Sequence, residues 1–352
     1  MTAHTTRRTI TATHRTRRTC PPPHHTRRTI TATARTVRRT AARSRTAAIG
    51  ALVVAGALLL TACGDQTKNH PRPGDPTRPD TVGSSAAAAL LPPEIRARGV
   101  IRVGSDIAYP PVEFKDGSGD TVGIDPDLGA ALGKELGVTF RFENGTFDTL
   151  VTGLRSKRYD LAMSAMTDTR NRQEGIDSDT GKKVGEGVDF VDYLTAGVSI
   201  YTRKGDDQGI RTWADLCGKK IAVQRGTVSH NLAKTESKKC AGGRSIAMET
   251  FDNDLEARTR LRSGGADAGS SDFPVAAWAV KTSGGGKDFQ LVGEQVQAAP
   301  YGIAVAKGND RLTKAVRAAL DAVIRSGEYG RIIAKWGVEA GAVTEAKLNG
   351  GS

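Results

Sequence analysis

The stretch TFDTLVTGLRSKRYDLAMSAMTDTRNR, residues 146–172 of this 352-residue chain, decides the fold. Its apolar residues predict a helix over 149–156 and then a buried strand over 160–164. Small and hydroxyl-bearing residues follow the strand, as in loops that present N–H groups and hydroxyls at a helix start. Arg172 comes a few residues later. Because ligands of α/β proteins bind beyond the carboxyl ends of the strands, the stretch also predicts a binding site.

Outward from this stretch, short apolar strands alternate with helices from residue 90 to residue 336. Leu128, Leu132 and Leu136 recur at helical spacing and predict an amphipathic helix over 126–136. The pattern also predicts strands over 100–103, 138–142, 198–202, 220–223, 246–250, 266–270 and 302–307, and helices over 212–216, 228–238, 254–263, 273–281, 311–326 and 329–336. This alternation is typical of an α/β fold with mostly parallel sheets covered by helices.

The net charge of +13 belongs to the N-terminal end of the chain. Twelve of the 51 Lys and Arg lie in residues 1–63, which contain no Asp or Glu, and the other 39 are balanced by 38 acidic residues. A nucleic-acid-binding surface needs basic side chains clustered on a folded face. The nearly neutral body gives little sign of one, so we expect no nucleic-acid partner.

Residues 1–63 have the pattern of a basic low-complexity segment followed by an export signal. The octapeptide TRRTITAT occurs twice within residues 1–45, which have almost no large apolar residues. Two interpretations stay open: low-complexity sequence, or a start codon assigned too early, with Val37 a plausible true start. The apolar run at 47–61 is too short to span a bilayer comfortably and fits a signal peptide.

The apolar run ends in LTACG, residues 60–64, which resembles the lipobox of bacterial lipoproteins. The resemblance implies that Cys63 becomes the first residue and carries a lipid, which anchors the protein to the outer face of the cell membrane. A plain signal peptide with an incidental cysteine is the alternative. Residues 64–89 are rich in Pro, Gly, Ser and Asp and predict a flexible tether.

Cys217 and Cys240 remain in the exported body once Cys20 and Cys63 are set aside. An even pair in an oxidising compartment predicts a disulfide, and two free buried thiols are the alternative. Two cysteines with so few histidines nearby are a poor ligand set for zinc. We therefore expect neither a metal nor a cofactor.

Eight motifs lie between residues 100 and 336, and they include VGSDIAYPPVEF at 103–114, the stretch at 146–172, DLCGKKIAVQRGTVS at 215–229 and ADAGSSDFPVA at 266–276. They occur in the same order as in the polar amino-acid-binding proteins, family 3 of the bacterial solute-binding proteins. The chain therefore resembles this family over nearly all of its body.

The resemblance implies a periplasmic-binding-protein-like fold of type II, with two α/β lobes of mostly parallel sheets joined by two crossover segments. The crossovers would fall near 193–199 and 298–301. Lobe 1 would comprise residues 90–197 plus 300–347, and lobe 2 residues 198–299. The lobes would close around a ligand by hinge motion.

The resemblance also implies a site for an amino acid. Arg172 takes the place of the family's carboxylate-binding Arg, and a planar guanidinium can hold a carboxylate bidentately. A solvated surface Arg is the alternative. The neighbouring loops would contribute Ser164, Met166 and Thr167 from lobe 1 and Gln224 and Thr227 from lobe 2.

Asp106 and Asp272 match the family's acidic residues for the ligand's ammonium group. Tyr109 and Phe147 match the aromatic residues that enclose its side chain. The alternatives are that the Asp side chains cap a helix or turn and that the aromatic rings belong to the core. Asp125 is expected to be structural, at a helix start.

Four departures from the family stand out. Val112 occupies a position where Phe is usual, and Arg170 replaces a frequent Pro. Residues 173–187 form a longer and more polar stretch than usual, which we expect to be a surface loop. The sequence SDF at 271–273 also differs from the common pairing, so the resemblance does not carry a side-chain specificity.

The leading hypothesis is a monomeric, extracytoplasmic lipoprotein that captures a polar amino acid and delivers it to the permease subunits of an ABC importer. A lyase or dehydratase of small carboxylates, or a ligand sensor with a separate partner, are alternatives on the same fold. His230 is the only His after residue 70. Because no nucleophile or base pairs with it locally, Glu113 is the candidate base for an enzyme.

Overall fold

The computed structural model describes residues 85–352. The basic segment, the predicted signal peptide, the predicted lipidation at Cys63 and most of the predicted tether lie outside these residues. The helices are α1 (Ala86–Leu90), α2 (Pro93–Arg98), α3 (Ile124–Leu136), α4 (Leu150–Arg155), α5 (Arg170–Glu174), α6 (Val228–Ser237), α7 (Asp254–Arg262), α8 (Phe273–Thr282), α9 (Asp310–Arg325) and α10 (Glu328–Trp336), with 3-10 turns η1 (Phe147–Thr149), η2 (Trp213–Leu216), η3 (Ser283–Gly285) and η4 (Glu339–Gly341). The strands are β1 (Val100–Ser105), β2 (Phe114–Lys115), β3 (Thr121–Val122), β4 (Thr139–Asn144), β5 (Leu161–Ala162), β6 (Val188–Arg203), β7 (Lys220–Gln224), β8 (Ala247–Phe251), β9 (Ala268–Asp272), β10 (Phe289–Ala306) and β11 (Lys347–Leu348).

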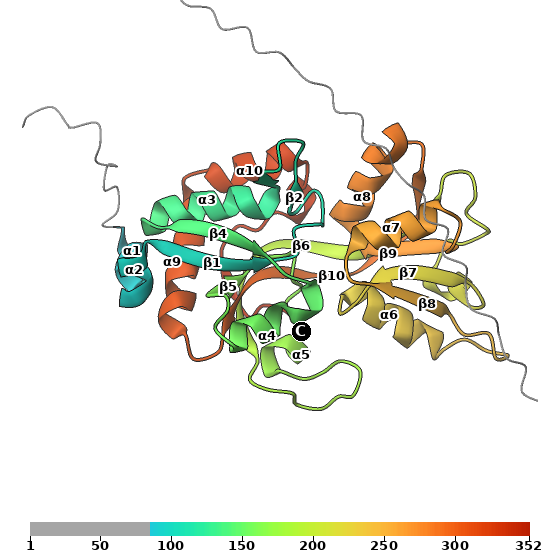
Figure 1. The fold of residues 1–352 in the computed structure, drawn as a ribbon, viewed down its shortest axis with the longest axis horizontal. Coiled ribbons are helices and arrows are strands. Elements are labelled where there is room, and N and C mark those ends of the chain that lie inside the picture. Colours follow the sequence, from blue (N-terminus) through green and yellow to red (C-terminus); the bar gives the residue numbers. More distant parts are fainter. Residues whose placement is uncertain (1–84) are drawn as a thin grey trace, which may run out of the picture. The chain divides into compact units, whose positions relative to one another are not determined.

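The main sheet runs in the order β4-β1-β5-β10-β6-β9-β7-β8 (Figure 1). Strand β11 pairs with β6. Strands β4, β1 and β5 are parallel to one another, and so are β8, β7 and β9. Strands β6 and β10 pair antiparallel with each other and with their neighbours. The predicted α/β class, with mostly parallel strands in two lobes, is confirmed.

Strands β6 and β10 pass from lobe 1 to lobe 2 and back. They are 16 and 18 residues long, and the crossovers predicted near 193–199 and 298–301 lie inside them. The division of the chain that we expected at 197/198 and 299/300 also falls within these strands. The sequence predicted only their ends, because Gly197, Gly293 and Pro300 interrupt the strand pattern. The pairing register shifts between Val292 and Val296, next to Gly293.

Helices cover both faces of the sheet in lobe 1. Successive residues of β10 show this, since Ile303 and Val305 pack in the core with α3, α9 and α10, whereas Ala304 packs with α4. Alternate residues of a strand point to opposite faces. The same holds in lobe 2, where α6 and η2 pack in one core cluster and α8 packs against Tyr201 and Phe289 in another. None of the helices described in residues 85–352 has the length and apolar character that a bilayer crossing requires.

The C-terminal boundary predicted for the tether, residue 89, is wrong, because residues 86–89 belong to helix α1. The Ser85 hydroxyl accepts a hydrogen bond from the Ala88 N–H and donates one to the Glu135 carbonyl, at 3.1 and 2.6 Å. Ala87 and Ala88 are buried. Alanine favours a helix once a cap and a packing surface are present, and composition alone did not reveal either.

An aromatic cluster of Phe114, Trp278 and Trp336 joins the two lobes. Trp278 belongs to α8 in lobe 2, and its ring centroid lies 6.3 Å from that of Phe114 and 6.0 Å from that of Trp336. The indole N–H of Trp336 donates to Asp127 of α3 at 2.8 Å. The lobe 1 side of the cluster is therefore held in place by a hydrogen bond as well as by packing.

The disulfide predicted between Cys217 and Cys240 is confirmed, with a Cα–Cα distance of 5.6 Å. It joins the residue after η2 to the turn after α6. The bridge closes a loop with a sequence separation of 23 residues. In the chain-entropy model it stabilises the fold mainly by restricting the unfolded chain.

Replacing both cysteines with Ser should lower the free energy of unfolding by about 3 kcal/mol, because a loop of this size loses its constraint in the unfolded chain. Urea unfolding of the two proteins, each with and without reductant, measures the difference. Reductant should destabilise the parent protein and leave the double-Ser variant unchanged. Equal unfolding free energies for the two oxidised proteins would show that the bridge does not stabilise lobe 2.

Candidate functional site

The carboxyl ends of strands from both lobes bring the expected site residues together. Asp106 and Tyr109 follow β1, and Ser164, Met166 and Thr167 follow β5. Gln224 ends β7, Thr227 is the N-cap residue before α6, and Asp272 ends β9. Most of these residues are buried, and Phe147, Arg172 and Thr227 are half-buried.

Asp106 and Gln224 form a hydrogen bond across the lobes. The Gln224 amide donates to the Asp106 carboxylate and to the Asp252 carbonyl, the latter at 3.1 Å. Burial raises the pKa of Asp106 to about 7, although the hydrogen bond from Gln224 opposes the rise. Asp106 follows a strand and has an amide partner, so its carboxylate faces lobe 2 rather than capping its own loop.

Asp272 lies at the N-cap position of α8, but its side chain makes no capping hydrogen bond. Its backbone N–H donates to the Tyr109 hydroxyl at 3.1 Å, again across the lobes. Burial raises the pKa of Asp272 to about 6, and the neighbouring Tyr301 and Tyr109 hydroxyls, together with the charge of Arg172, moderate the rise. The capping alternative therefore does not explain this carboxylate.

Arg172 lies in α5, a five-residue helix that the sequence did not predict. The Thr169 hydroxyl caps this helix by accepting from the Arg172 N–H at 3.4 Å. The guanidinium donates to the Thr167 carbonyl at 2.7 Å and to the Gly226 carbonyl of lobe 2 at 3.0 Å. Its central carbon lies 5.1 Å from the ring centroid of Phe147. Arg172 is therefore not a solvated surface residue, and burial lowers its pKa to about 10.

The Ser164 and Thr227 hydroxyls have hydrogen-bond partners within the protein. The Ser164 hydroxyl accepts from the Asp106 N–H at 3.0 Å and donates to Glu113 at 2.7 Å. The Thr227 hydroxyl accepts from the His230 N–H at 3.2 Å, as the N-cap of α6, and donates to the Gln224 carbonyl at 2.8 Å. These side chains fix the binding loops.

Met166 and Thr167 shape the loop through their backbones. The Met166 carbonyl accepts from the Gly302 N–H at 2.9 Å, and the Met166 side chain packs in the core with α4. Thr167 forms an isolated bridge with Tyr301. Between them and the strand, Ala165 adopts a φ of 45°, a left-handed conformation that non-glycine residues rarely take.

Glu113 and Asp125 form a buried carboxyl pair behind this loop. Asp125 accepts hydrogen bonds from the Tyr193 hydroxyl at 2.6 Å and from the Ala165 N–H at 3.3 Å. Burial raises the pKa of both carboxyls. The pair supports the strained Ala165 and the Ser164 hydroxyl, which agrees with the structural role expected for Asp125. Glu113 lines neither of the cavities beside Arg172, and neither do Asp106, Tyr109 and Asp272.

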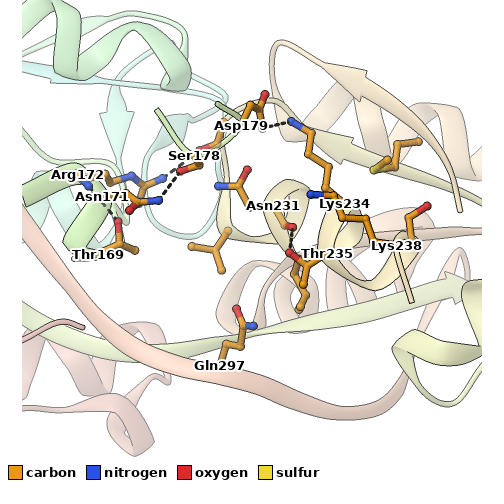
Figure 2. A pocket seen from close by; sticks show the side chains of 15 residues that line it. Thr169, Asn171, Arg172, Ser178, Asp179, Asn231, Lys234, Thr235, Lys238 and Gln297 are labelled. Atoms are coloured by element: carbon orange, nitrogen blue, oxygen red, sulfur yellow. Dashed lines mark hydrogen bonds and ion pairs between the residues drawn. The ribbon is translucent and has the colours of Figure 1, made fainter. Parts of the chain in front are cut away.

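Two adjoining cavities of about 700 and 390 Å³ lie between the lobes beside Arg172. Figure 2 shows Arg172 and Asn171 on one side and Asn231 and Lys234 of α6 on the other. Asp179 also lines both cavities, from within the stretch 173–187 that the sequence analysis expected to be only a surface loop. No signal in the sequence placed this residue next to α6. Within residues 85–352, no cluster of His, Cys, Asp and Glu side chains could hold a metal ion.

The chain matches a known family over most of the described residues. The family described as bacterial extracellular solute-binding proteins, family 3, matches residues 101–339. An arginine-binding protein of Corynebacterium glutamicum is 32% identical over 87% of this chain and 96% of its own length. An L-cystine-binding protein of Escherichia coli is 28% identical over 73% of this chain and 89% of its own length.

Solved structures agree with these relatives. An ancestral arginine-binding protein bound to arginine superposes with a TM-score of 0.61 at 37% identity, covering 68% of this chain and 98% of that one. An ancestral amino-acid-binding protein, described as a precursor of cyclohexadienyl dehydratase, gives a TM-score of 0.60 at 36% identity, with 69% and 97% covered. The chain therefore belongs to family 3 of the bacterial extracellular solute-binding proteins, which serve ABC transporters.

Proposed function

We propose that this protein captures a basic L-amino acid, arginine first among them, and delivers it to the permease of an ABC importer. The charge balance of the site carries this proposal. Asp106 and Asp272 are two buried carboxylates, and Arg172 supplies one half-buried guanidinium. Asp254 lies nearby, but Arg258 neutralises it at 2.7 Å.

A zwitterionic amino acid leaves one of these carboxylates without a partner. Its carboxylate would pair with Arg172, and its ammonium with Asp272, which faces the charge of that same Arg. Asp106 would then stay buried beside a neutral amide, and an unpaired buried charge is costly. A ligand with a cationic side chain would supply the missing partner, and Tyr109 and Phe147 would enclose that side chain.

Several relatives support a basic ligand, although the relatives do not all bind the same amino acid. Arginine-binding proteins stand among them, but so does a cystine-binding protein, and an ancestral arginine-binding protein has been solved bound to glutamine. The lyase or dehydratase alternative is connected to the family by a related structure, an ancestral amino-acid-binding protein described as a precursor of a dehydratase. Against it, Glu113 is buried, and one of its carboxyl oxygens accepts a hydrogen bond from the Ser164 hydroxyl.

Calorimetric titration against arginine, lysine, glutamine and cystine tests the proposal. We expect arginine to bind tightly and Arg172→Ala to abolish binding of every amino acid. Asp106→Asn should weaken arginine binding by roughly 30-fold or more, the cost of breaking a buried charge pair. The same change should spare glutamine, because only a cationic side chain needs this carboxylate.

Asp272→Asn is the matched control, since it should weaken arginine and glutamine alike through their common ammonium group. Glutamine or cystine binding without arginine binding would disprove the basic-ligand assignment and leave the transport function standing. Binding of none of them would refute the amino-acid function, and small carboxylates would then be assayed for binding and turnover.

The affinity for arginine should rise between about pH 5 and about pH 7 and level off above. The pKa values of Asp106 and Asp272 are raised to about 7 and about 6, and both carboxylates must lose their protons to pair with cations. Binding at lower pH therefore releases protons, and one released proton gives a slope of about tenfold per pH unit. Asp106→Asn should reduce this slope. A flat or falling affinity over this range would contradict the assignment.

We further propose that the protein is exported and held at the outer face of the membrane by a lipid on Cys63. The order of basic region, apolar run, small residues and cysteine supports this. Replacing Cys63 with Ser should move the protein from the membrane fraction to the medium or periplasm and abolish labelling by radioactive fatty acid. Unchanged membrane association with no labelling of the parent protein would refute the anchor.

A further inference from the structure

The stretch 173–187 contains a hairpin, which leaves lobe 1 just after helix α5 and Arg172. Ile176 pairs with Lys183, and the Asp177 N–H donates to the Lys182 carbonyl at 2.9 Å. The Val184 N–H donates to the Gly175 carbonyl at 2.9 Å. We call residues 176–183 the hairpin and residues 178–180 its tip.

The base of the hairpin is packed too closely to swing freely. Gly175 has a φ of 71°, and a Cβ there would lie 2.1 Å from the Gly185 carbonyl oxygen. A Cβ on Gly187 would lie 1.9 Å from the Gln173 carbonyl oxygen. The Arg155 guanidinium of α4 donates to the Glu186 carbonyl at 2.6 Å. These contacts fix the direction in which the hairpin leaves lobe 1.

The tip is shaped so that Asp179 points away from lobe 1. The Asp177 carboxylate accepts from the N–H groups of Asp179 and Thr180 at 3.2 and 2.8 Å, and from the Thr180 hydroxyl at 2.7 Å. A local Asp turn of this kind holds the backbone without help from other segments. The Asp179 carboxylate is then free to contact lobe 2.

Asp179 crosses the cleft to α6. Its carboxylate lies 2.5 Å from the Lys234 ammonium, as Figure 2 shows. Helix α6 begins after Gly226 and Thr227, and the Gly226 carbonyl accepts from Arg172. The ion pair therefore joins the segment that follows Arg172 to the helix that follows the lobe 2 binding loop. It forms only where the two sides of the cleft come together.

We propose that the hairpin is a strap, in which Asp179 and Lys234 are positioning residues that hold the lobes together over a bound ligand and slow its release. This inference rests on the proposed function for the ligand. The two side chains are 54% and 28% exposed, so the ion pair contributes as exposed pairs do. Losing it should speed ligand dissociation by about two- to fivefold. Because the strap acts after closure, the association rate should change little.

Stopped-flow dissociation of L-arginine from the full-length protein tests the strap. Asp179→Asn and Lys234→Gln should each raise the dissociation rate about two- to fivefold, and the double variant should raise it no further, because the two residues act as one pair. The charge swap, Asp179→Lys with Lys234→Asp, should restore the slow rate. Effects that add in the double variant, or parental rates in both single variants, would overturn the proposal.

Lys239→Gln is the matched control. Lys239 pairs with Glu236 at 2.7 Å, close to Lys234 along the chain, and does not cross the cleft. This variant removes a similar charge from lobe 2, and it should release arginine at the parental rate. A rate increase equal to that of Lys234→Gln would mean that net charge, and not the cross-cleft contact, sets the rate.

A crosslinking measurement separates failure of the strap from failure of the proposed function. Cysteines introduced at positions 179 and 234 should be joined by a short bis-maleimide, faster when L-arginine is present, whereas cysteines at 179 and 239 should not. If arginine does not bind at all, the proposed function fails, and crosslinking of the ligand-free protein still reports whether the tip reaches α6. Absence of the 179–234 crosslink in both conditions would refute the strap.

Discussion

The antiparallel pairing of β6 with β10 ties the two halves of the molecule together. Strand β5 pairs with β10 through Ala162 and Ala304, and β9 pairs with β6 through Asp272 and Val198. The loop that carries Ser164 and Thr167 and the end of the strand that carries Asp272 therefore take their positions from one continuous ladder. Any bend or shear in this ladder changes the distance between the binding loops. The geometry of the site therefore depends on the β6–β10 ladder.

The site groups of the two lobes satisfy one another in the arrangement described. Gln224 donates to Asp106, the Asp272 N–H donates to Tyr109, and Arg172 donates to Gly226. A ligand that enters must replace these contacts, so binding is an exchange of hydrogen bonds rather than a simple gain. The net binding free energy then depends on a contact that the protein does not supply for itself, a positive charge beside the Asp106 carboxylate. Selectivity for a cationic ligand follows, because Gln224 offers Asp106 only a neutral amide.

The sequence predicts the features that arise from local periodicity. The helix with Leu128, Leu132 and Leu136 and the strands beside it are each encoded by a short window, so their order and type could be predicted. Helix α5 could not, because its residues RNRQE have no apolar spacing and depend on the Thr169 cap. The full lengths of β6 and β10 were hidden by internal Gly and Pro residues, which the long ladder tolerates as register shifts. The contact between Asp179 and Lys234 joins residues 55 positions apart and has no local signal.

The aromatic cluster gives the protein a built-in optical reporter. Of its three tryptophans, Trp213 is buried in the core of lobe 2, whereas Trp278 and Trp336 face each other from different lobes. A change in lobe separation alters the surroundings of two indoles and leaves the third as a constant background. Intrinsic fluorescence and near-ultraviolet circular dichroism therefore record lobe movement in the unmodified chain, without a dye and independently of which ligand causes the movement.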